Sequence, residues 1–292
     1  LLMNLLCLFS IFIPMPDIES NSIYNELLNK VNYYSGNDIK NISLKYLYQK
    51  FNLTNSDLIL NKKIKWNYKV KRTFYEDLEK INSGVPIQYI TNSQFFYDEN
   101  FYVDNNVLIP RPETEELVSH IIKHEKDNKK KNILDIGTGS GCIAIILYKH
   151  LNAHVFGIDL SKEAVKIANK NNRLVENKVR FINESIEEYT PKTKFDVIVS
   201  NPPYISSEDK NKVDDNVLNY EPHKALFVSK DPLYFYKKIL RFSRKHLNEK
   251  GNIYFEINDK YESELERLFS EFECKFIEDI YGKKRFLFVT IT

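Results

Sequence analysis

The chain has 292 residues, of which 42% are hydrophobic and 28% are charged, a mixture typical of a globular protein with one large or two smaller domains. Its formal net charge of +2 provides no strong attraction for nucleic acid, so direct nucleic-acid binding is not expected. Cys7, Cys142 and Cys274 lie far apart and form no CxxC pair, so neither a disulfide framework nor a zinc site is suggested, and a reducing cytoplasm is the default.

Residues 1–16 form an apolar N-terminal extension. The run from Leu1 to Pro14 is too short to span a bilayer as a helix, so no membrane attachment is predicted. It also lacks a basic first part and a small-residue cleavage site, which argues against a signal peptide. A start codon misassigned upstream of Met15, a disordered tail and an interface-forming tail each account for it.

Residues 17–86 are predicted to form a small helical domain. Apolar residues recur there at helical spacing, and no strand-like alternation interrupts them; they are Ile23, Leu27, Leu28, Val31, Leu44, Leu47, Tyr48, Phe74, Leu78 and Ile81. Gly84-Val85-Pro86 ends the last helix.

Residues 87–107 are predicted to form a β-hairpin that links two domains, with two aromatic runs separated by a turn at Asp98-Glu99-Asn100. A proline-rich segment follows, and Thr114 could cap a helix from Glu115 to Lys123. Glu113 and Glu115 are tempting acid–base residues. Carboxylates are favourable at any helix N-terminus, however, and a structural role is preferred for both.

Strands and helices alternate through residues 108–292, which predicts an α/β domain with a doubly wound parallel sheet and a hairpin-like end. The predicted strands are Ile133–Ile136, Val155–Asp159, Val179–Asn183, Asp196–Ser200, Asn252–Ile257, Lys275–Ile280 and Arg285–Thr290. The predicted helices are Gly141–Leu151, Lys162–Arg173, Pro232–His246 and Lys260–Phe272. The segment from Asn201 to Asp231 has no periodicity and is predicted to be a substrate-binding loop.

A glycine-rich turn follows the first strand of this domain and indicates a cofactor site, with the sequence Gly137-Thr138-Gly139-Ser140-Gly141. A dinucleotide fingerprint would place its third glycine at Cys142, which counts against NAD and FAD. Asp135 is placed near a cationic group of the ligand, and Asp159 ends the next strand where an acid takes two ribose hydroxyls. Two carboxylates and a glycine turn suit S-adenosylmethionine. His120 and His124 lack the further ligands that a metal site needs.

The acceptor site is predicted at Asn201-Pro202-Pro203-Tyr204. Two prolines stop the preceding strand and stiffen the backbone at its carboxyl end, where open α/β sheets place ligands. The Asn201 side-chain oxygen and a nearby carbonyl can accept both hydrogen bonds of one planar NH2 group, while the Tyr204 ring lies against its plane. This corner is suited to an amino or amide nitrogen.

These motifs resemble a class I S-adenosylmethionine-dependent methyltransferase with a Rossmann-like fold. Further matches narrow the resemblance to the HemK/PrmC-type glutamine methyltransferases that act on peptide chain release factors; these matches are Pro86–Ile90, Leu108–Glu115, Tyr220-Glu221-Pro222 and Asp279 with Gly282–Phe286. The resemblance covers the chain from about Asp17 onward, including the helical domain.

The resemblance implies that the methyl acceptor is the side-chain amide of the glutamine in the release factor's Gly-Gly-Gln loop, with S-adenosylhomocysteine as the second product. It places Gly137 to Gly141, Asp159 and Asn201 at the cofactor, and Asn201 to Tyr204 at the glutamine. Ser185 and Ile186 align with adenine-contacting positions but depart from the family's residue types. Arg111 and Glu221, within the further matches, are assigned to substrate binding.

Two other functions remain open on the residues alone. A nucleic-acid adenine methyltransferase presents the same acceptor geometry, because the exocyclic amino group of adenine is also planar. The near-neutral charge and the lack of a separate basic domain count against it. A non-catalytic module that binds S-adenosylmethionine is the second alternative, and the intact Asn201 counts against that. The protein is expected to be a monomer, with the helical domain docking the release factor.

Overall fold

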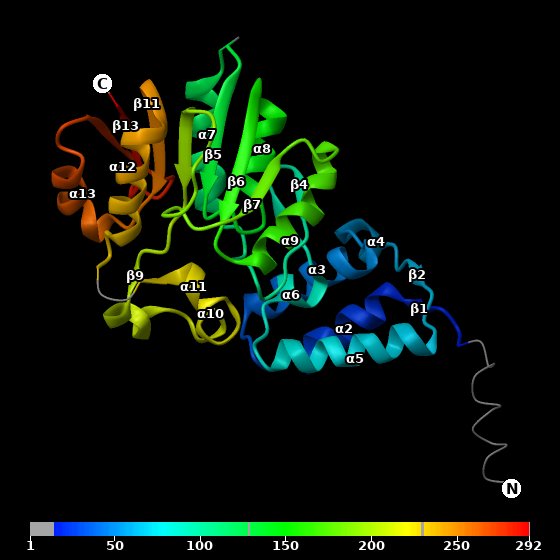
Figure 1. Cartoon of the computed structure of the whole chain (residues 1–292). Coiled ribbons are helices and arrows are strands. Elements are labelled where there is room, and N and C mark those ends of the chain that lie inside the picture. Colours follow the sequence, from blue (N-terminus) through cyan, green and yellow to red (C-terminus); the bar gives the residue numbers. More distant parts are fainter. Residues whose placement is uncertain (1–14, 128, 229–230, 292) are drawn as a thin grey trace, which may run out of the picture. The chain divides into compact units, whose positions relative to one another are not determined.

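The computed structural model describes residues 15–127, 129–228 and 231–291 (Figure 1). Most of the apolar extension, residues 1–14, therefore lies outside the described part. The chain divides into two compact units, the first ending at Thr91 and the second beginning at Asn92. Across the described ranges no helix is long and apolar enough to cross a membrane.

The first unit is helical, and a two-residue strand pair joins the segment before α2 to the segment before α5. Its helices are α2 (Ser20–Lys30), α3 (Asn37–Phe51), α4 (Asn55–Ile59), α5 (Tyr68–Asn82) and α6 (Ile87–Thr91), and its strands are β1 (Ile18–Glu19) and β2 (Lys63–Ile64). The sequence-based assignment of the α6 residues to the hairpin was wrong. Pro86 supplies the carbonyl that accepts the first hydrogen bonds of α6, so the proline precedes a new helix.

Leucine, isoleucine and aromatic side chains from α2, α3 and α5 form the core of this unit, including Trp66 between Phe51 and Phe74. One carboxylate, Asp77, is buried in that core. It accepts a hydrogen bond from the Tyr46 hydroxyl at 3.0 Å and an ion pair from Lys50 at 2.8 Å. The buried charge is therefore paired and hydrogen-bonded, as its loss of water requires.

The second unit begins with a hairpin of β3 (Gln94–Phe96) and β4 (Glu99–Phe101). The turn is at Tyr97 and Asp98, which have φ of 48° and 64°, so the sequence-based placement at residues 98–100 was wrong by one residue. Two left-handed residues between paired strands match the twist of a hairpin, and this turn geometry overrode the polar run. Phe96 and Phe101 are buried in the core of this second unit.

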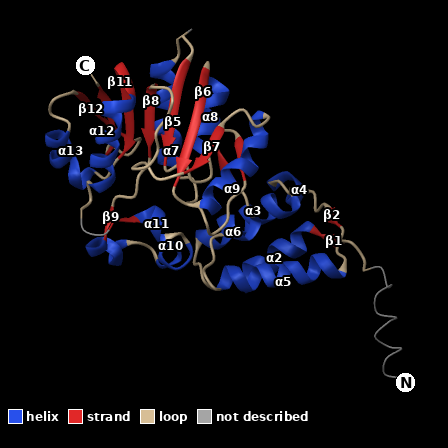
Figure 2. Ribbon diagram, in the orientation of Figure 1, coloured by secondary structure: helices blue, strands red, loops and turns tan. Residues whose placement is uncertain are grey.

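A mixed seven-stranded sheet forms the centre of the second unit, with the order β12-β13-β11-β8-β5-β6-β7 (Figure 2). Its strands are β5 (Lys131–Ile136), β6 (Ala153–Asp159), β7 (Arg180–Asn183), β8 (Phe195–Ser200), β11 (Leu247–Glu256), β12 (Glu273–Glu278) and β13 (Lys284–Thr290). β13 runs antiparallel to both neighbours, whereas β11, β8, β5, β6 and β7 are parallel. The predicted doubly wound sheet with a hairpin-like end is confirmed.

Helices cover both faces of this sheet (Figure 2). They are α7 (Pro112–Glu125), α8 (Cys142–His150), α9 (Lys162–Asn171), α12 (Tyr234–His246) and α13 (Glu262–Leu268), with 3-10 turns η1 (Asn172–Val175) and η3 (Asp259–Tyr261). Val197 and Val199 pack in one core with α7 and α8, and Ile198 packs in the other with α12 and α13. Successive residues of β8 thus enter opposite cores, as a strand dictates.

The sequence predicted a loop without regular structure after Asn201. The structure instead contains short helices and strands there. It contains β9 (Ile205–Ser206), η2 (Ser207–Lys212), α10 (Asp215–Tyr220), α11 (His223–Leu226) and β10 (Phe227–Val228). β9 and β10 pair in parallel and close the segment on itself. These elements are too short to produce a recognisable hydrophobic period, which explains the missed assignment.

Candidate active site

The predicted site residues meet at the carboxyl ends of three adjacent strands. Ile136 of β5 pairs with Ser200 of β8 on one side and with Ile158 of β6 on the other. The glycine turn, Asn201 and Asp159 directly follow or end these strands, so they share one edge of the sheet. This edge is where parallel α/β sheets bind ligands.

The three glycines of the turn all have left-handed backbones, with φ of 74° at Gly137, 54° at Gly139 and 81° at Gly141. A Cβ on Gly137 would meet no atom within 4 Å, and one on Gly139 would meet only a backbone oxygen at 4.0 Å. At Gly141 a Cβ would lie 2.8 Å from Phe181. The first two glycines therefore leave an open surface for a ligand, and the third allows α8 to pack closely.

Asp135 is fully buried beneath this turn. Its Oδ2 accepts a hydrogen bond from the Thr138 hydroxyl at 2.6 Å, while no group in the described residues donates to its Oδ1. Burial raises the pKa of Asp135 to about 7, against the lowering effects of the Thr138 hydroxyl and of the nearby Ala144 backbone amide. A cationic amino group on the ligand would supply the missing donor. The carboxylate thus fits a ligand with an ammonium group.

Asp159 at the end of β6 fastens the glycine turn to the next loop. Its Oδ2 accepts from the Gly139 amide at 2.9 Å, and its Oδ1 accepts from the Ser161 amide at 2.8 Å. Burial raises the pKa of Asp159. Each carboxylate oxygen has a further lone pair, so the group can still accept from two hydroxyls. Because Oδ2 contacts the Gly139 amide, the carboxylate lies beside the open part of the glycine turn.

The remaining cofactor candidates have structural contacts of their own. The Ser140 side chain is buried, and its carbonyl accepts from the Asn171 amide at 2.9 Å. Ser185 follows β7, and its hydroxyl accepts from the Glu188 amide at 3.2 Å, as in a helical turn start. Ile186 packs at the border of the core that contains α12. A contact of Ser185 or Ile186 with adenine stays a prediction.

Asn201 is oriented by two residues that sequence reasoning did not connect to it. Its Nδ2 donates to the Thr114 hydroxyl at 3.1 Å, and that hydroxyl donates to Oε2 of Glu256 at 2.7 Å. Thr114 was predicted to cap a helix, and this was wrong: α7 begins at Pro112 with Arg111 as its N-cap, so Thr114 lies inside the first turn. Its side chain is free to bond across to the sheet.

Tyr204 contacts the same buried carboxylate. Its hydroxyl lies 3.4 Å from Oε1 of Glu256, and the Tyr236 hydroxyl donates to the Glu256 backbone carbonyl at 3.0 Å. Burial raises the pKa of Glu256 to about 7. The sequence signal for this residue was one glutamate within the apolar end of β11, at the strand's carboxyl end. A lone charge in a buried strand needs a partner, and the partners here come from distant segments.

Arg111 and Glu221 bind each other. The guanidinium of Arg111 lies 2.5 Å from Oε1 of Glu221, and the Ile109 amide donates to Oε2 at 3.3 Å. The Glu221 side chain is only 1% exposed, and the Arg111 side chain is 32% exposed. Glu221 therefore fastens the segment after α10 from inside the protein, and its assignment to substrate binding stays a prediction. A substrate contact by Arg111 stays a prediction.

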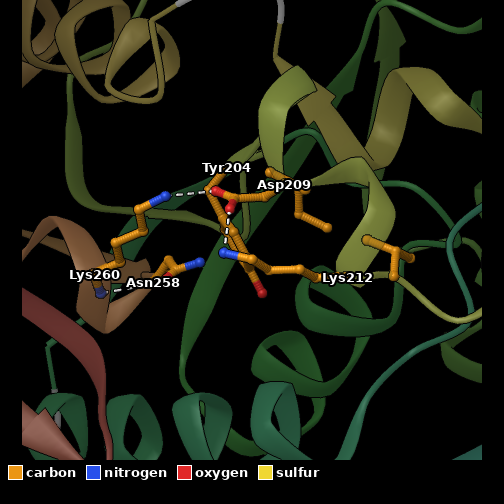
Figure 3. Close-up of a pocket in the computed structure, with 7 residues that line it drawn as sticks. Tyr204, Asp209, Lys212, Asn258 and Lys260 are labelled. Atoms are coloured by element: carbon orange, nitrogen blue, oxygen red, sulfur yellow. Dashed lines mark hydrogen bonds and ion pairs between the residues drawn. The ribbon is translucent and has the colours of Figure 1, made fainter.

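A cavity of about 320 Å³ lies beside Tyr204 (Figure 3). Tyr204, Ile205, Asp209, Lys212, Val213, Asn258 and Lys260 line it. Asp209 pairs with Lys212 and with Lys260, each at 2.7 Å, and the second pair joins the segment after the Asn-Pro-Pro-Tyr motif to η3. No cluster of three metal-ligating side chains occurs within the described ranges.

Comparisons with known proteins identify the family. A family model described as "Methyltransferase domain" matches residues 127–272. A release factor glutamine methyltransferase of Flavobacterium psychrophilum is 44% identical over 79% of this chain and 84% of its own. Another, of Bacteroides thetaiotaomicron, is 38% identical over 87% of this chain and 93% of its own.

One solved structure agrees on the fold. The hMettl16 catalytic domain, solved in complex with MAT2A 3'UTR hairpin 6, aligns with a TM-score of 0.50 at 16% identity, over 66% of this chain and 74% of that chain. At that identity the likeness concerns the fold, a class I methyltransferase sheet. Together with the identities above 30% over most of both chains, it leads to one conclusion: this chain belongs to the release factor glutamine methyltransferase family.

Proposed function

We propose that this protein methylates the side-chain amide nitrogen of the glutamine in the Gly-Gly-Gln motif of a peptide chain release factor. S-adenosylmethionine would be the donor and S-adenosylhomocysteine the second product. When bound, the donor supplies an electrophilic methyl group on a positively charged sulfur. The reaction class follows from the family, and the residues of the site support the substrate chemistry.

The donor would be held by the edge of β5 and β6. The unpartnered Oδ1 of Asp135 fits the amino group of the methionine part, and Gly137 and Gly139 allow close approach of the backbone. Asp159 can accept from the ribose hydroxyls, because each of its oxygens carries only one hydrogen bond from the protein.

The acceptor amide would be held by Asn201 and Pro202. The nitrogen of an amide is a poor nucleophile because its lone pair is delocalised into the carbonyl. Hydrogen bonds from its two N–H groups to the Asn201 Oδ1 and the Pro202 carbonyl would orient the nitrogen and increase its electron density. Tyr204 would pack on the amide plane and restrict its tilt, with Pro203 keeping the two ends of the motif at a fixed distance. Alignment of the amide nitrogen, the methyl carbon and the sulfur in a site shielded from water would supply most of the rate acceleration.

The orientation of the Asn201 carboxamide is the observation that carries this proposal. Its NH2 group is occupied by Thr114, whereas within the described residues nothing donates to its Oδ1. A site for an N–H donor needs an acceptor there. The same orientation would bind an anion or a carbonyl poorly, because neither of these groups can donate a hydrogen bond.

The test is methyl transfer from labelled S-adenosylmethionine to a purified release factor, with the modified residue located by mass spectrometry. A release factor with the motif glutamine replaced by alanine is the control. Asn201→Ala should retain donor binding and lose turnover by on the order of a hundredfold or more. Label on DNA or RNA in place of protein would overturn the proposal, and no transfer to any acceptor would favour a non-catalytic binding module.

The partner and the compartment belong to the same proposal. The release factor would dock on the helical unit, residues 17–86, with the enzyme acting as a monomer. Because release factors act on ribosomes, the reaction would take place in the cytoplasm. If the helical unit docks the release factor, its deletion should lower the affinity for the release factor more than the affinity for the donor.

A further inference from the structure

A chain of three hydrogen-bonding side chains reaches from the interior of the sheet to the acceptor corner. The Asn201 carboxamide donates to the Thr114 hydroxyl at 3.1 Å, and the hydroxyl donates to the Glu256 carboxylate at 2.7 Å. Thr114 and Glu256 are each at most 3% exposed, so water does not compete for these bonds. Thr114 lies in α7, Glu256 ends β11, and Asn201 directly follows β8.

The direction of this chain depends on the charge of its inner end. An ionised carboxylate can only accept, so the single hydroxyl proton of Thr114 must go to Glu256. The Thr114 oxygen can then only accept from Asn201, which requires the NH2 end of the carboxamide. A protonated Glu256 could instead donate to the Thr114 oxygen. The hydroxyl would then be free to donate to the Asn201 oxygen, with the carboxamide reversed.

We propose that Glu256 is a positioning residue which, through Thr114, determines which end of the Asn201 carboxamide faces the methyl acceptor. The inference rests on the proposed function and adds a condition to it: the site accepts an N–H donor only while Glu256 is ionised. Its contact with Tyr204 at 3.4 Å makes the same carboxylate a support for the aromatic wall of the site.

Two charged side chains, Glu113 and Arg285, act on the ionisation of Glu256. Glu113 on α7 disfavours the charged form, and Arg285 on β13 favours it, while Arg285 also bonds Asp279 at 3.4 Å. On the α12 side, the Tyr236 hydroxyl bonds the backbone carbonyl of the same residue. Burial is the largest effect and raises the pKa of Glu256 to about 7. The protonated fraction therefore changes near neutral pH.

The first test compares kcat at saturating donor and release factor from pH 6 to 9. For the wild type kcat should rise with pH through the ionisation of Glu256. Glu256→Gln should lower kcat by on the order of tenfold and remove this rise, because a glutamine side chain can donate or accept and no longer sets the direction. KM for the donor should change little, since the residues proposed to bind it are elsewhere. Glu249→Gln, an exposed position on the same strand, is the matched control and should keep the wild-type profile.

Thr114 provides a second, independent pair of variants. Thr114→Val keeps the shape and removes the hydroxyl, so kcat should fall by on the order of tenfold, whereas Thr114→Ser should restore it. Turnover close to wild type in both Glu256→Gln and Thr114→Val would overturn the proposal. So would a Thr114→Ser variant as slow as Thr114→Val, since that would indicate a packing role only.

A carbon-13 NMR titration of the Glu256 carboxyl separates this inference from the proposed function. Thr114→Val should raise the pKa of Glu256, because it removes a hydrogen bond to the charged form. An unchanged pKa would overturn the relay whatever the enzyme methylates. If the wild type labels no release factor but the pKa rises as expected, the proposed substrate fails and the relay stands.

Discussion

Replacing Gly141 by alanine should destabilise the methyltransferase unit through a contact that Gly137→Ala does not make. Both positions have left-handed backbones, with φ of 81° and 74°. At either one the positive φ costs about 1–2 kcal/mol. The smaller conformational entropy of the unfolded alanine chain offsets about 0.4–1 kcal/mol of that cost. These two terms are common to both variants and cancel in their difference.

The difference comes from the surroundings. A Cβ at Gly141 would lie 2.8 Å from the Phe181 ring and 3.2–3.3 Å from Cβ and Cα of Ala168, whereas one at Gly137 would meet nothing within 4 Å. The Phe181 ring could shift, but the backbone of α9 at Ala168 cannot retreat without repacking. Overpacking of this kind costs about 1–3 kcal/mol. Gly141→Ala should therefore be less stable than Gly137→Ala by that amount.

The assay is unfolding in urea, with hydrogen exchange in peptides from β5 and β8 as the probe of the unfolded fraction. Intrinsic fluorescence is unsuitable, because the single tryptophan, Trp66, lies in the helical unit. Equal losses of unfolding free energy in the two variants would refute the reasoning, since they would mean that α8 and α9 do not pack closely at the glycine turn. A more stable Gly141→Ala variant would refute it more strongly.

Two further predictions concern buried carboxylates. Tyr46→Phe leaves the buried Asp77 with one donor fewer and should lower the stability of the helical unit by about 1–3 kcal/mol, measured by Trp66 fluorescence in urea; an unchanged midpoint would contradict it. At pH 7 Asp135, with a pKa of about 7, is about half protonated, and a ligand ammonium beside it would lower that pKa. Binding of S-adenosylmethionine should then release up to about half a proton. Calorimetry in buffers of different ionisation enthalpy detects this release, and Asp135→Asn should abolish it. A binding enthalpy of the wild type that does not depend on the buffer would contradict the placement of the ligand ammonium beside Asp135.

Local patterns were sufficient for most of the fold. The apolar runs of β5 and β8, and the helical spacing in α2 and α5, each lie within a few turns or residues of chain. Their period depends on backbone geometry that holds in any protein. The glycine turn and the double proline were readable for the same reason. Their effect is on the backbone where they stand, and both proved to lie at the carboxyl ends of adjacent strands.

Contacts between distant residues could not be read in this way. Glu256 and Asn201 are joined by Thr114, and Arg111 is joined to Glu221, each across about a hundred residues of chain or more. No period or turn signal connects such positions. A single glutamate in a buried strand indicates only that some partner must exist. The sequence by itself thus determined the order of most helices and strands along the chain and the motifs at the ligand-binding edge of the sheet. Only the tertiary structure decided which side chains face one another, because a buried polar group is satisfied by whichever donor the packed elements bring within about 3 Å of it.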